Sequence, residues 1–342
     1  MYKKMNVSQK FVRTKKLKIA YYHFGEGNEK QLLLLHGNLS SSAFFLPLVP
    51  MLETKYELFI PDLRCFGNSD ALPIDATRGY RDFSDDVYDF VTALGLTRFN
   101  ICGWSMGGNI AMQLLTDHEE LIEKMILLAP GSPYGFGGTK DEIGTPCSPV
   151  GLGSGGGCAN PALVSAAATG NPVILKDILD KFYFTPLFTM PKFWEDLFIE
   201  ELKKIKIGND KYPGNYTFSV KWPYVVAGTK GILNAMSSKY GRLDNMLDVY
   251  HKPDVLWIHG RDDIIVSDTS LIEFGYLGKA GFVPGWPGER LYPPQPMVSQ
   301  IRYFLEMYRT KGGEFAEALL PGGHMCALEH PELFISAVDT FL

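Results

Sequence analysis

Short apolar runs alternate along this chain with segments whose apolar residues recur every three or four positions. Residues 32–35 are four consecutive leucines, and residues 255–259 form a second mainly apolar run. Such runs are typical of strands buried on both faces of a parallel sheet. The segment from Phe83 to Leu94 has helical spacing and is followed by Gly95, which predicts a helix that ends there. The alternation predicts an α/β fold with a mostly parallel central sheet flanked by helices.

The alternation is interrupted in the middle of the chain. Residues 131–157 contain ten glycines and three prolines, a loop composition. Helical patterns follow at residues 173–181 and 193–204, each after an Asn-Pro or Pro start signal. We therefore expect a core made of residues 1–130 and 252–342, and a mainly helical cap inserted at residues 131–251.

One motif combines a glycine-bounded serine with a change from strand to helix. Residues 99–102 predict a short buried strand, residues 103–107 read Gly-Trp-Ser-Met-Gly, and helical spacing begins at Ile110. A serine in so tight a turn is a nucleophile elbow, in which the hydroxyl is lifted clear of the sheet at a helix N-terminus. Ser105 is the predicted nucleophile.

Residues 36–39, which read His-Gly-Asn-Leu, follow the leucine strand. The His-Gly dipeptide at residues 36 and 37, together with the elbow, resembles the α/β-hydrolase family, in which His-Gly opens the oxyanion loop. The resemblance implies that the backbone N–H groups of Asn38 and Met106 bind the oxyanion. We interpret the His36 side chain as a structural group that holds the loop.

The resemblance also suggests an acid and a base. Residues 260–263 read Gly-Arg-Asp-Asp and are similar to the family's acid turn, which places the acid at Asp263 with Asp262 as the alternative. His324 follows a predicted strand at residues 317–320 and is the expected base. His330, before the terminal helix, is the competitor, with capping or surface duty favoured for it. The order Ser105, Asp263, His324 is the order of this fold.

A further loop, residues 61–70, is similar to the family's D-x-R-G-x-G-x-S segment. Cys65 stands where the family has glycine. We interpret Asp62 and Arg64 as structural residues that form an internal ion pair.

In the family, insertions at this point form a lid over the serine. The cap is rich in aromatic residues, and most of these are expected to pack the cap itself. Candidates for the substrate pocket are Trp104, Phe184, Phe188, Trp194 and Phe198. The long loop at residues 281–296 is a further candidate wall of the same cleft.

Composition excludes several classes of partner. A formal net charge of −5 argues against nucleic acid binding. No segment is long and apolar enough to cross a membrane, and the basic stretch that includes Lys3 and Lys4 is not followed by the apolar part of a signal peptide. Five cysteines without framework spacing suit a reducing cytoplasm.

No cluster of residues has metal-ligand spacing, and no cofactor is expected. A formal G-x-G-x-x-G at Gly151, Gly153 and Gly156 has no strand before it, so it is a weak dinucleotide signal. The sequence permits a homo-oligomer.

The resemblance implies a serine hydrolase that cleaves a small carboxylic ester or lactone through an acyl-enzyme. Carbon–carbon bond hydrolases and cofactor-free perhydrolases use the same triad and remain alternatives. A non-catalytic ligand-binding receptor on this fold is the alternative from a different class. Epoxide hydrolases and haloalkane dehalogenases are disfavoured because they need a carboxylate at the position of Ser105.

Overall fold

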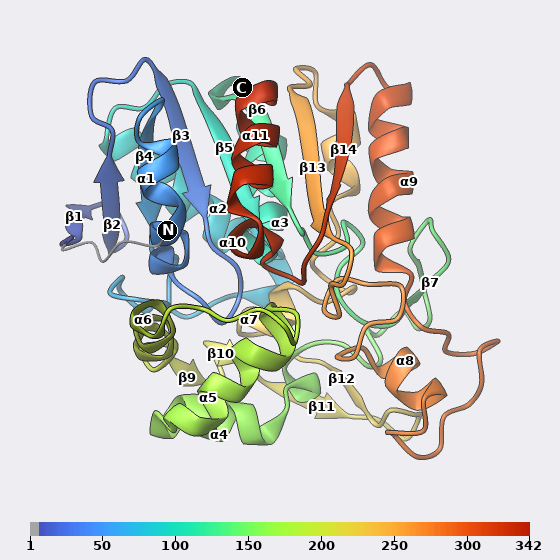
Figure 1. The fold of residues 1–342 in the computed structure, drawn as a ribbon. Helices are drawn as coiled ribbons and strands as arrows, with labels where there is room; N and C mark the ends of the chain where they lie inside the picture. The colour runs from blue at the N-terminus through green and yellow to red at the C-terminus, as the bar shows by residue number, and fades with distance from the viewer. Residues whose placement is uncertain (1–6) are drawn as a thin grey trace.

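An eight-stranded sheet forms the centre of the protein (Figure 1). The computed structural model describes residues 7–342, so Lys3 and Lys4 lie outside the described part. The strand order is β1-β2-β4-β3-β5-β6-β13-β14; β2 is antiparallel to both of its neighbours, and all pairings from β4 across to β14 are parallel. The strands are β1 (Lys10–Arg13), β2 (Lys18–Phe24), β3 (Lys30–Leu35), β4 (Tyr56–Pro61), β5 (Phe99–Trp104), β6 (Ile122–Leu128), β13 (Asp254–Gly260) and β14 (Phe315–Leu320).

Helices cover both faces of this sheet, which confirms the predicted α/β class. The core helices are α1 (Val49–Leu52), α2 (Arg81–Ala93), α3 (Met106–Asp117), α9 (Met297–Thr310), α10 (Cys326–Glu329) and α11 (Pro331–Phe341). In Figure 1, α1 and α11 lie in front of the sheet, and α2 and α3 lie behind it. The leucines of β3 and every residue of β5 are buried, as expected for strands covered on both faces.

The segment between β6 and β13 lies below the carboxyl ends of the parallel strands in Figure 1. Its helices are α4 (Pro161–Thr169), α5 (Pro172–Ile178), α6 (Lys192–Leu202) and α7 (Ile232–Ala235). Its short strands pair as β7 (Thr139–Lys140) with β8 (Thr145–Pro146), β9 (Ile207–Gly208) with β10 (Tyr212–Pro213), and β11 (Tyr216–Phe218) with β12 (Val225–Ala227). Helix α8 (Phe274–Lys279), from the connection between β13 and β14, lies beside these elements. No helix within residues 7–342 has the length and apolar character needed to span a bilayer.

The cap helices follow their start signals. The predicted helix at 173–181 is α5, which ends at Ile178 and continues as a π-helical turn over Leu179–Tyr183. The predicted helix at 193–204 is α6. Helix α4 was not predicted, although the side chain of Asn160 caps it and Gly170 ends it with φ +66°. The Asn-Pro start and Gly stop were the signals that could have located it.

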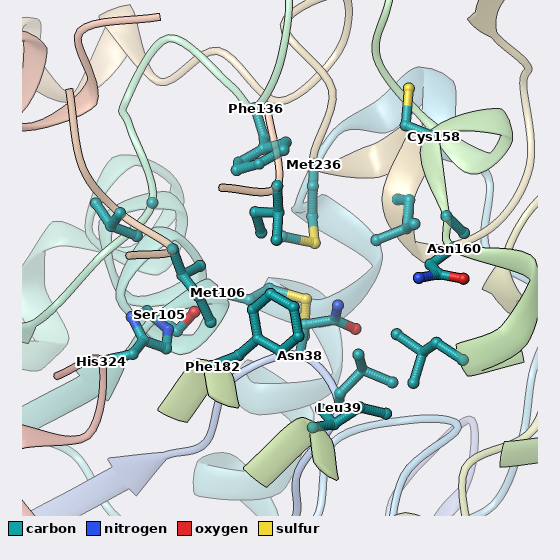
Figure 2. A pocket seen from close by; sticks show the side chains of 18 of the residues that line it. Asn38, Leu39, Ser105, Met106, Phe136, Cys158, Asn160, Phe182, Met236 and His324 are labelled. Carbon is teal, nitrogen blue, oxygen red and sulfur yellow. The ribbon is translucent and has the colours of Figure 1, made fainter. Parts of the chain in front are cut away.

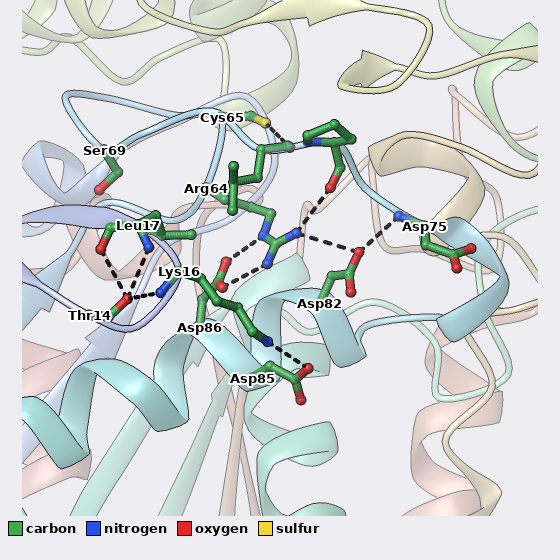
Figure 3. Close-up of polar contacts among 12 residues, drawn as sticks. Thr14, Lys16, Leu17, Arg64, Cys65, Ser69, Asp75, Asp82, Asp85 and Asp86 are labelled. Carbon is green, nitrogen blue, oxygen red and sulfur yellow. Dashed lines mark hydrogen bonds and ion pairs between the residues drawn. The ribbon is translucent and has the colours of Figure 1, made fainter.

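The predicted ion pair between Asp62 and Arg64 is wrong, because each side chain has other partners. Figure 3 shows those of Arg64. The Arg64 guanidinium contacts two carboxylates of α2: it donates to Asp86 with Nη2···Oδ1 2.7 Å, and its Nη1 lies 3.4 Å from Asp82 Oδ2. The Asp62 carboxylate instead accepts from the N–H and hydroxyl of Ser42 at 2.9 and 2.6 Å. Both residues are structural, as expected, but they join the loop to different elements. Cys65 has φ +69°, the left-handed conformation that favours glycine.

Candidate active site

Ser105 lies in a strained turn between β5 and α3. Its backbone has φ 54° and ψ −124°, a combination that costs free energy for a residue with a side chain. The neighbouring glycines allow the turn to close. A Cβ on Gly103 would lie 2.3 Å from the Gly107 oxygen, and a Cβ on Gly107 would lie 2.3 Å from the Leu35 oxygen. The turn therefore has the shape expected of a nucleophile elbow.

His324 and Asp263 form a buried pair at the carboxyl ends of β14 and β13. His324 Nδ1 lies 2.7 Å from Asp263 Oδ2, and each side chain is only 2% exposed. The other carboxylate oxygen, Oδ1, accepts from the N–H groups of Ile265 and Val266 at 2.7 and 3.0 Å, which fixes the carboxylate. A carboxylate at Nδ1 keeps the proton on that nitrogen, so Nε2 is the proton acceptor of the neutral ring.

The Nε2 atom of His324 has no hydrogen-bond partner among the described residues. The ring lies beside the Ser105 hydroxyl in Figure 2, and both residues line one cavity. A hydrogen bond between the two is not formed in this structure, and such catalytic contacts commonly tighten only when substrate binds. The Trp104 indole N–H donates to the His324 carbonyl oxygen at 3.0 Å and so holds the backbone of His324.

The structure does not bring the alternative acid and base to this site. Asp262 is exposed. Its backbone N–H donates a hydrogen bond to the Gly322 oxygen at 2.9 Å. His330 is half-buried at the N-cap of α11, where its side chain caps no N–H group. His330 therefore occupies the N-cap position that the capping interpretation predicted, but its side chain makes no capping hydrogen bond.

The predicted oxyanion residues lie beside the serine. Asn38 follows β3, Met106 is the first residue of α3, and both line the cavity with Ser105 (Figure 2). Two backbone N–H groups at this edge of the sheet can donate to a developing oxyanion. The oxyanion roles of Asn38 and Met106 stay predictions.

The His36 side chain holds this loop, as predicted. Its Nε2 accepts from the Leu63 N–H at 3.0 Å, so its Nδ1 carries the proton and donates to the Gly37 oxygen at 2.8 Å. On the cap side, the Tyr183 hydroxyl donates to the Leu39 oxygen at 2.7 Å. The loop is therefore tied both to the sheet and to the cap.

Burial lowers the pKa of His36 to about 4, from an ordinary value of 6.5. The unfolded chain binds the proton below pH 6.5, whereas the folded protein binds it only near pH 4. The free energy of unfolding should therefore fall by about 2 kcal/mol between pH 7.5 and pH 5 through this residue alone. In urea unfolding, the loss of this free energy between pH 7.5 and pH 5 should be about 2 kcal/mol larger in the wild type and in the control His330→Gln than in His36→Gln. The same pH dependence in His36→Gln as in the wild type would contradict the assignment.

The cavity at Ser105 has a volume of about 310 Å³ and is mainly apolar. Its apolar side chains come from the cap, the glycine-rich loop and the segment after Asp263. They include Leu163, Ile178, Phe182, Leu233, Phe136 and Ile265. None of its lining residues is Asp, Glu, Lys or Arg. Burial raises the pKa of the lining tyrosines Tyr80, Tyr183 and Tyr212, so their hydroxyls are neutral near pH 7.

The five proposed pocket residues need correction. None of the set lines the cavity: Trp104, Phe184, Phe188, Trp194 and Phe198. They pack within the protein instead. The ring of Phe198 stacks on Phe44 with 4.0 Å between centroids, and Phe184 packs on Phe188 at 4.8 Å. The loop at 281–296 contributes no lining residue either.

The missed lining residues include Met236 and two residues, Phe182 and Tyr183, of the aromatic-rich segment 182–198 that also holds Phe184 and Phe198. The aromatic content of this segment correctly indicated that part of it lines the cavity. Which of its side chains face the cavity depends on the π-helical turn at Leu179–Tyr183, for which the sequence has no clear signal.

Phe182→Ala and Phe198→Ala should therefore affect different properties of the protein. Phe198 is fully buried, so its truncation should lower the free energy of unfolding by about 3 to 5 kcal/mol and leave the ranking of ester substrates unchanged. Phe182→Ala removes part of the cavity wall and should change that ranking, with a smaller loss of stability. Thermal unfolding and a panel of esters of graded acyl length would measure both effects. A changed ranking in Phe198→Ala alone would reverse the assignment.

The alpha/beta hydrolase fold family matches residues 30–144, a range that contains β3, Asn38 and the elbow. The sheet topology and the carboxyl-end positions of Ser105, Asp263 and His324 agree with that match. The chain has the α/β-hydrolase fold, and the family match covers about a third of its length. Over its whole length it is similar in fold to an esterase from Exiguobacterium antarcticum, with a TM-score of 0.59 and 19% identity across 97% of this chain and 98% of that chain.

Two curated relatives resemble part of this chain. A serine hydrolase-like protein of Danio rerio is 33% identical over 33% of this chain and 34% of its own length. A 2-hydroxy-6-oxo-6-phenylhexa-2,4-dienoate hydrolase of Comamonas testosteroni is 30% identical over 32% of this chain and 40% of its own length. The chain thus matches less than half the length of either relative.

Proposed function

We propose that this α/β-hydrolase is a serine hydrolase that cleaves a carboxylic ester or lactone through an acyl-enzyme on Ser105. The observation that carries the proposal is the buried His324–Asp263 pair, since His324 lines the same cavity as Ser105. A strained serine beside such a pair is the arrangement that activates a hydroxyl nucleophile.

The reaction begins when Ser105 Oγ attacks the substrate carbonyl and His324 Nε2 takes its proton. Asp263 stabilises the imidazolium ring that forms. The backbone N–H groups of Asn38 and Met106 donate to the oxyanion of the tetrahedral intermediate. His324 then returns the proton to the leaving alcohol, and in a lactone that alcohol stays attached to the acyl group. Water attacks the acyl-enzyme by the same steps and releases the acid.

The cavity lining favours a neutral ester over the substrates of carbon–carbon bond hydrolases. The relative from Comamonas testosteroni acts on a dienoate, which carries a carboxylate. The residues that line the cavity of this chain include no Lys or Arg to pair with such a group. Burial of an unpaired carboxylate is costly, so this chain should bind uncharged substrates.

A substrate panel tests this proposal. It contains 4-nitrophenyl esters of graded acyl length, neutral lactones and a 2-hydroxy-6-oxo-dienoate. The expected result is turnover of neutral esters or lactones with no turnover of the dienoate. Cleavage of the dienoate in preference to every ester would establish the carbon–carbon hydrolase alternative. No turnover and no reaction with a fluorophosphonate would instead support the ligand-binding receptor.

A further inference from the structure

The side chain of Asn38 contains a buried oxygen without a hydrogen-bond partner. The atom is Oδ1, and it is shielded from solvent by the surrounding protein. Such atoms are uncommon because an unpaired buried acceptor costs free energy. In the described part of the chain, the other residues with such atoms are Ser84, Asp89, Asn109, Trp194, Glu201 and Trp257. None of these lines the cavity, whereas Asn38 does.

Three other polar side chains of the cavity wall already have partners. The Ser132 hydroxyl donates to Gln300 at 2.7 Å, and the Tyr183 hydroxyl donates to the Leu39 oxygen. The Asn160 side-chain oxygen accepts from the Ala162 N–H at the start of α4. These groups maintain the wall, whereas the Asn38 amide has no hydrogen-bond partner among the described residues. Its Oδ1 has almost no accessible surface in this structure, so a ligand meets it after the amide turns about its soft terminal torsion.

The place of the Asn38 amide relates it to the reacting bond. Figure 2 shows it beside the side chains of Met106 and Phe182, which also line the cavity. The backbone N–H of the same residue is the proposed oxyanion donor, so the amide is close to the substrate carbonyl. A ligand group that reaches it must therefore be attached near the ester.

We propose that Asn38 determines specificity by binding a hydroxyl group that the substrate carries close to its ester bond. This inference rests on the proposed function. A hydroxyl fits because it donates to Oδ1 and can also accept from the amide nitrogen. A charged group does not fit, because no oppositely charged side chain lines the cavity. The substrate class is thus an uncharged, mainly apolar ester with a hydroxyl on the acyl or the alcohol part.

Two pairs of esters test this proposal, because each pair replaces a methyl group by a hydroxyl of similar size. On the acyl side the pair is ethyl 3-hydroxybutyrate and ethyl 3-methylbutyrate. On the alcohol side it is 2-hydroxyethyl hexanoate and propyl hexanoate. Acid release in a pH-stat measures kcat/KM for the wild type, for Asn38→Leu, which replaces the amide by an apolar group of similar shape, and for the control Ser132→Ala.

In at least one pair, the wild type should prefer the hydroxyl ester by about tenfold or more. Asn38→Leu should reduce that ratio to one or below, since the methyl ester then has the better partner. Ser132→Ala, which removes a lining hydroxyl that is bonded to Gln300, should keep the preference.

The possible failures are distinguishable. If the wild type cleaves both members of each pair equally, or if Asn38→Leu keeps the preference, the role of Asn38 is overturned and the hydrolase proposal stands. If none of the four esters is cleaved but a fluorophosphonate labels Ser105, the substrate class is wrong. If neither turnover nor labelling occurs, the proposed function and this inference both fail.

Discussion

Replacement of Ser105 by alanine should lower kcat/KM for ester hydrolysis by about four to six orders of magnitude in a protein that remains folded. The side chain supplies the attacking oxygen, and no other hydroxyl of the described residues lies in the elbow between β5 and α3. The alanine side chain is smaller than that of serine and causes no steric clash in the turn, so the thermal unfolding temperature should change little. Steady-state kinetics on the best ester of the panel would measure the loss.

Ser132→Ala is the matched control, because Ser132 lines the same cavity without a place in the proposed reaction. It should keep kcat/KM within about tenfold of the wild type. Activity of Ser105→Ala close to that of the wild type would show that another residue is the nucleophile.

Asp263→Asn should lower kcat by about four orders of magnitude. The carboxylate accepts the Nδ1 proton of His324, whereas an asparagine amide can donate to Nδ1 and so stabilise the tautomer with its proton on Nε2. That tautomer cannot take the proton of Ser105. Kinetics under saturating ester, with circular dichroism to verify the fold, would measure the effect.

Asp262→Asn is the control one residue away. Its side chain is exposed, so the substitution should leave kcat nearly unchanged. The reverse ranking of the two variants would move the acid to Asp262 and contradict the geometry of the buried pair.

The position of the candidate site could be predicted because its residues belong to short local motifs. The two glycines around Ser105 are required by close contacts within the turn itself, so their spacing is visible in the sequence. Asp263 and His324 each follow an apolar strand. In a parallel sheet, the carboxyl ends of such strands lie at one edge, where the structure brings the two residues into contact.

The cavity wall could not be predicted, because it depends on contacts between distant segments. Phe198 and Phe182 both belong to an aromatic run, but Phe198 stacks on Phe44 of the core, whereas Phe182 faces the cavity. Arg64 shows the same limit. Its motif indicated a structural role. However, its carboxylate partners lie on α2, outside the motif, and the residues of the motif do not indicate which distant segment Arg64 contacts.

Reaction of the wild-type protein with a fluorophosphonate, followed by intact-mass measurement and peptide mapping, is the direct test of Ser105 as an activated nucleophile. A fluorophosphonate modifies a serine only where a base activates its hydroxyl, so labelling reports the triad without knowledge of the substrate. We expect one adduct per chain, located on Ser105, slower to form in Asp263→Asn and absent in Ser105→Ala. An unmodified wild-type protein, or an adduct that persists in Ser105→Ala, would contradict it.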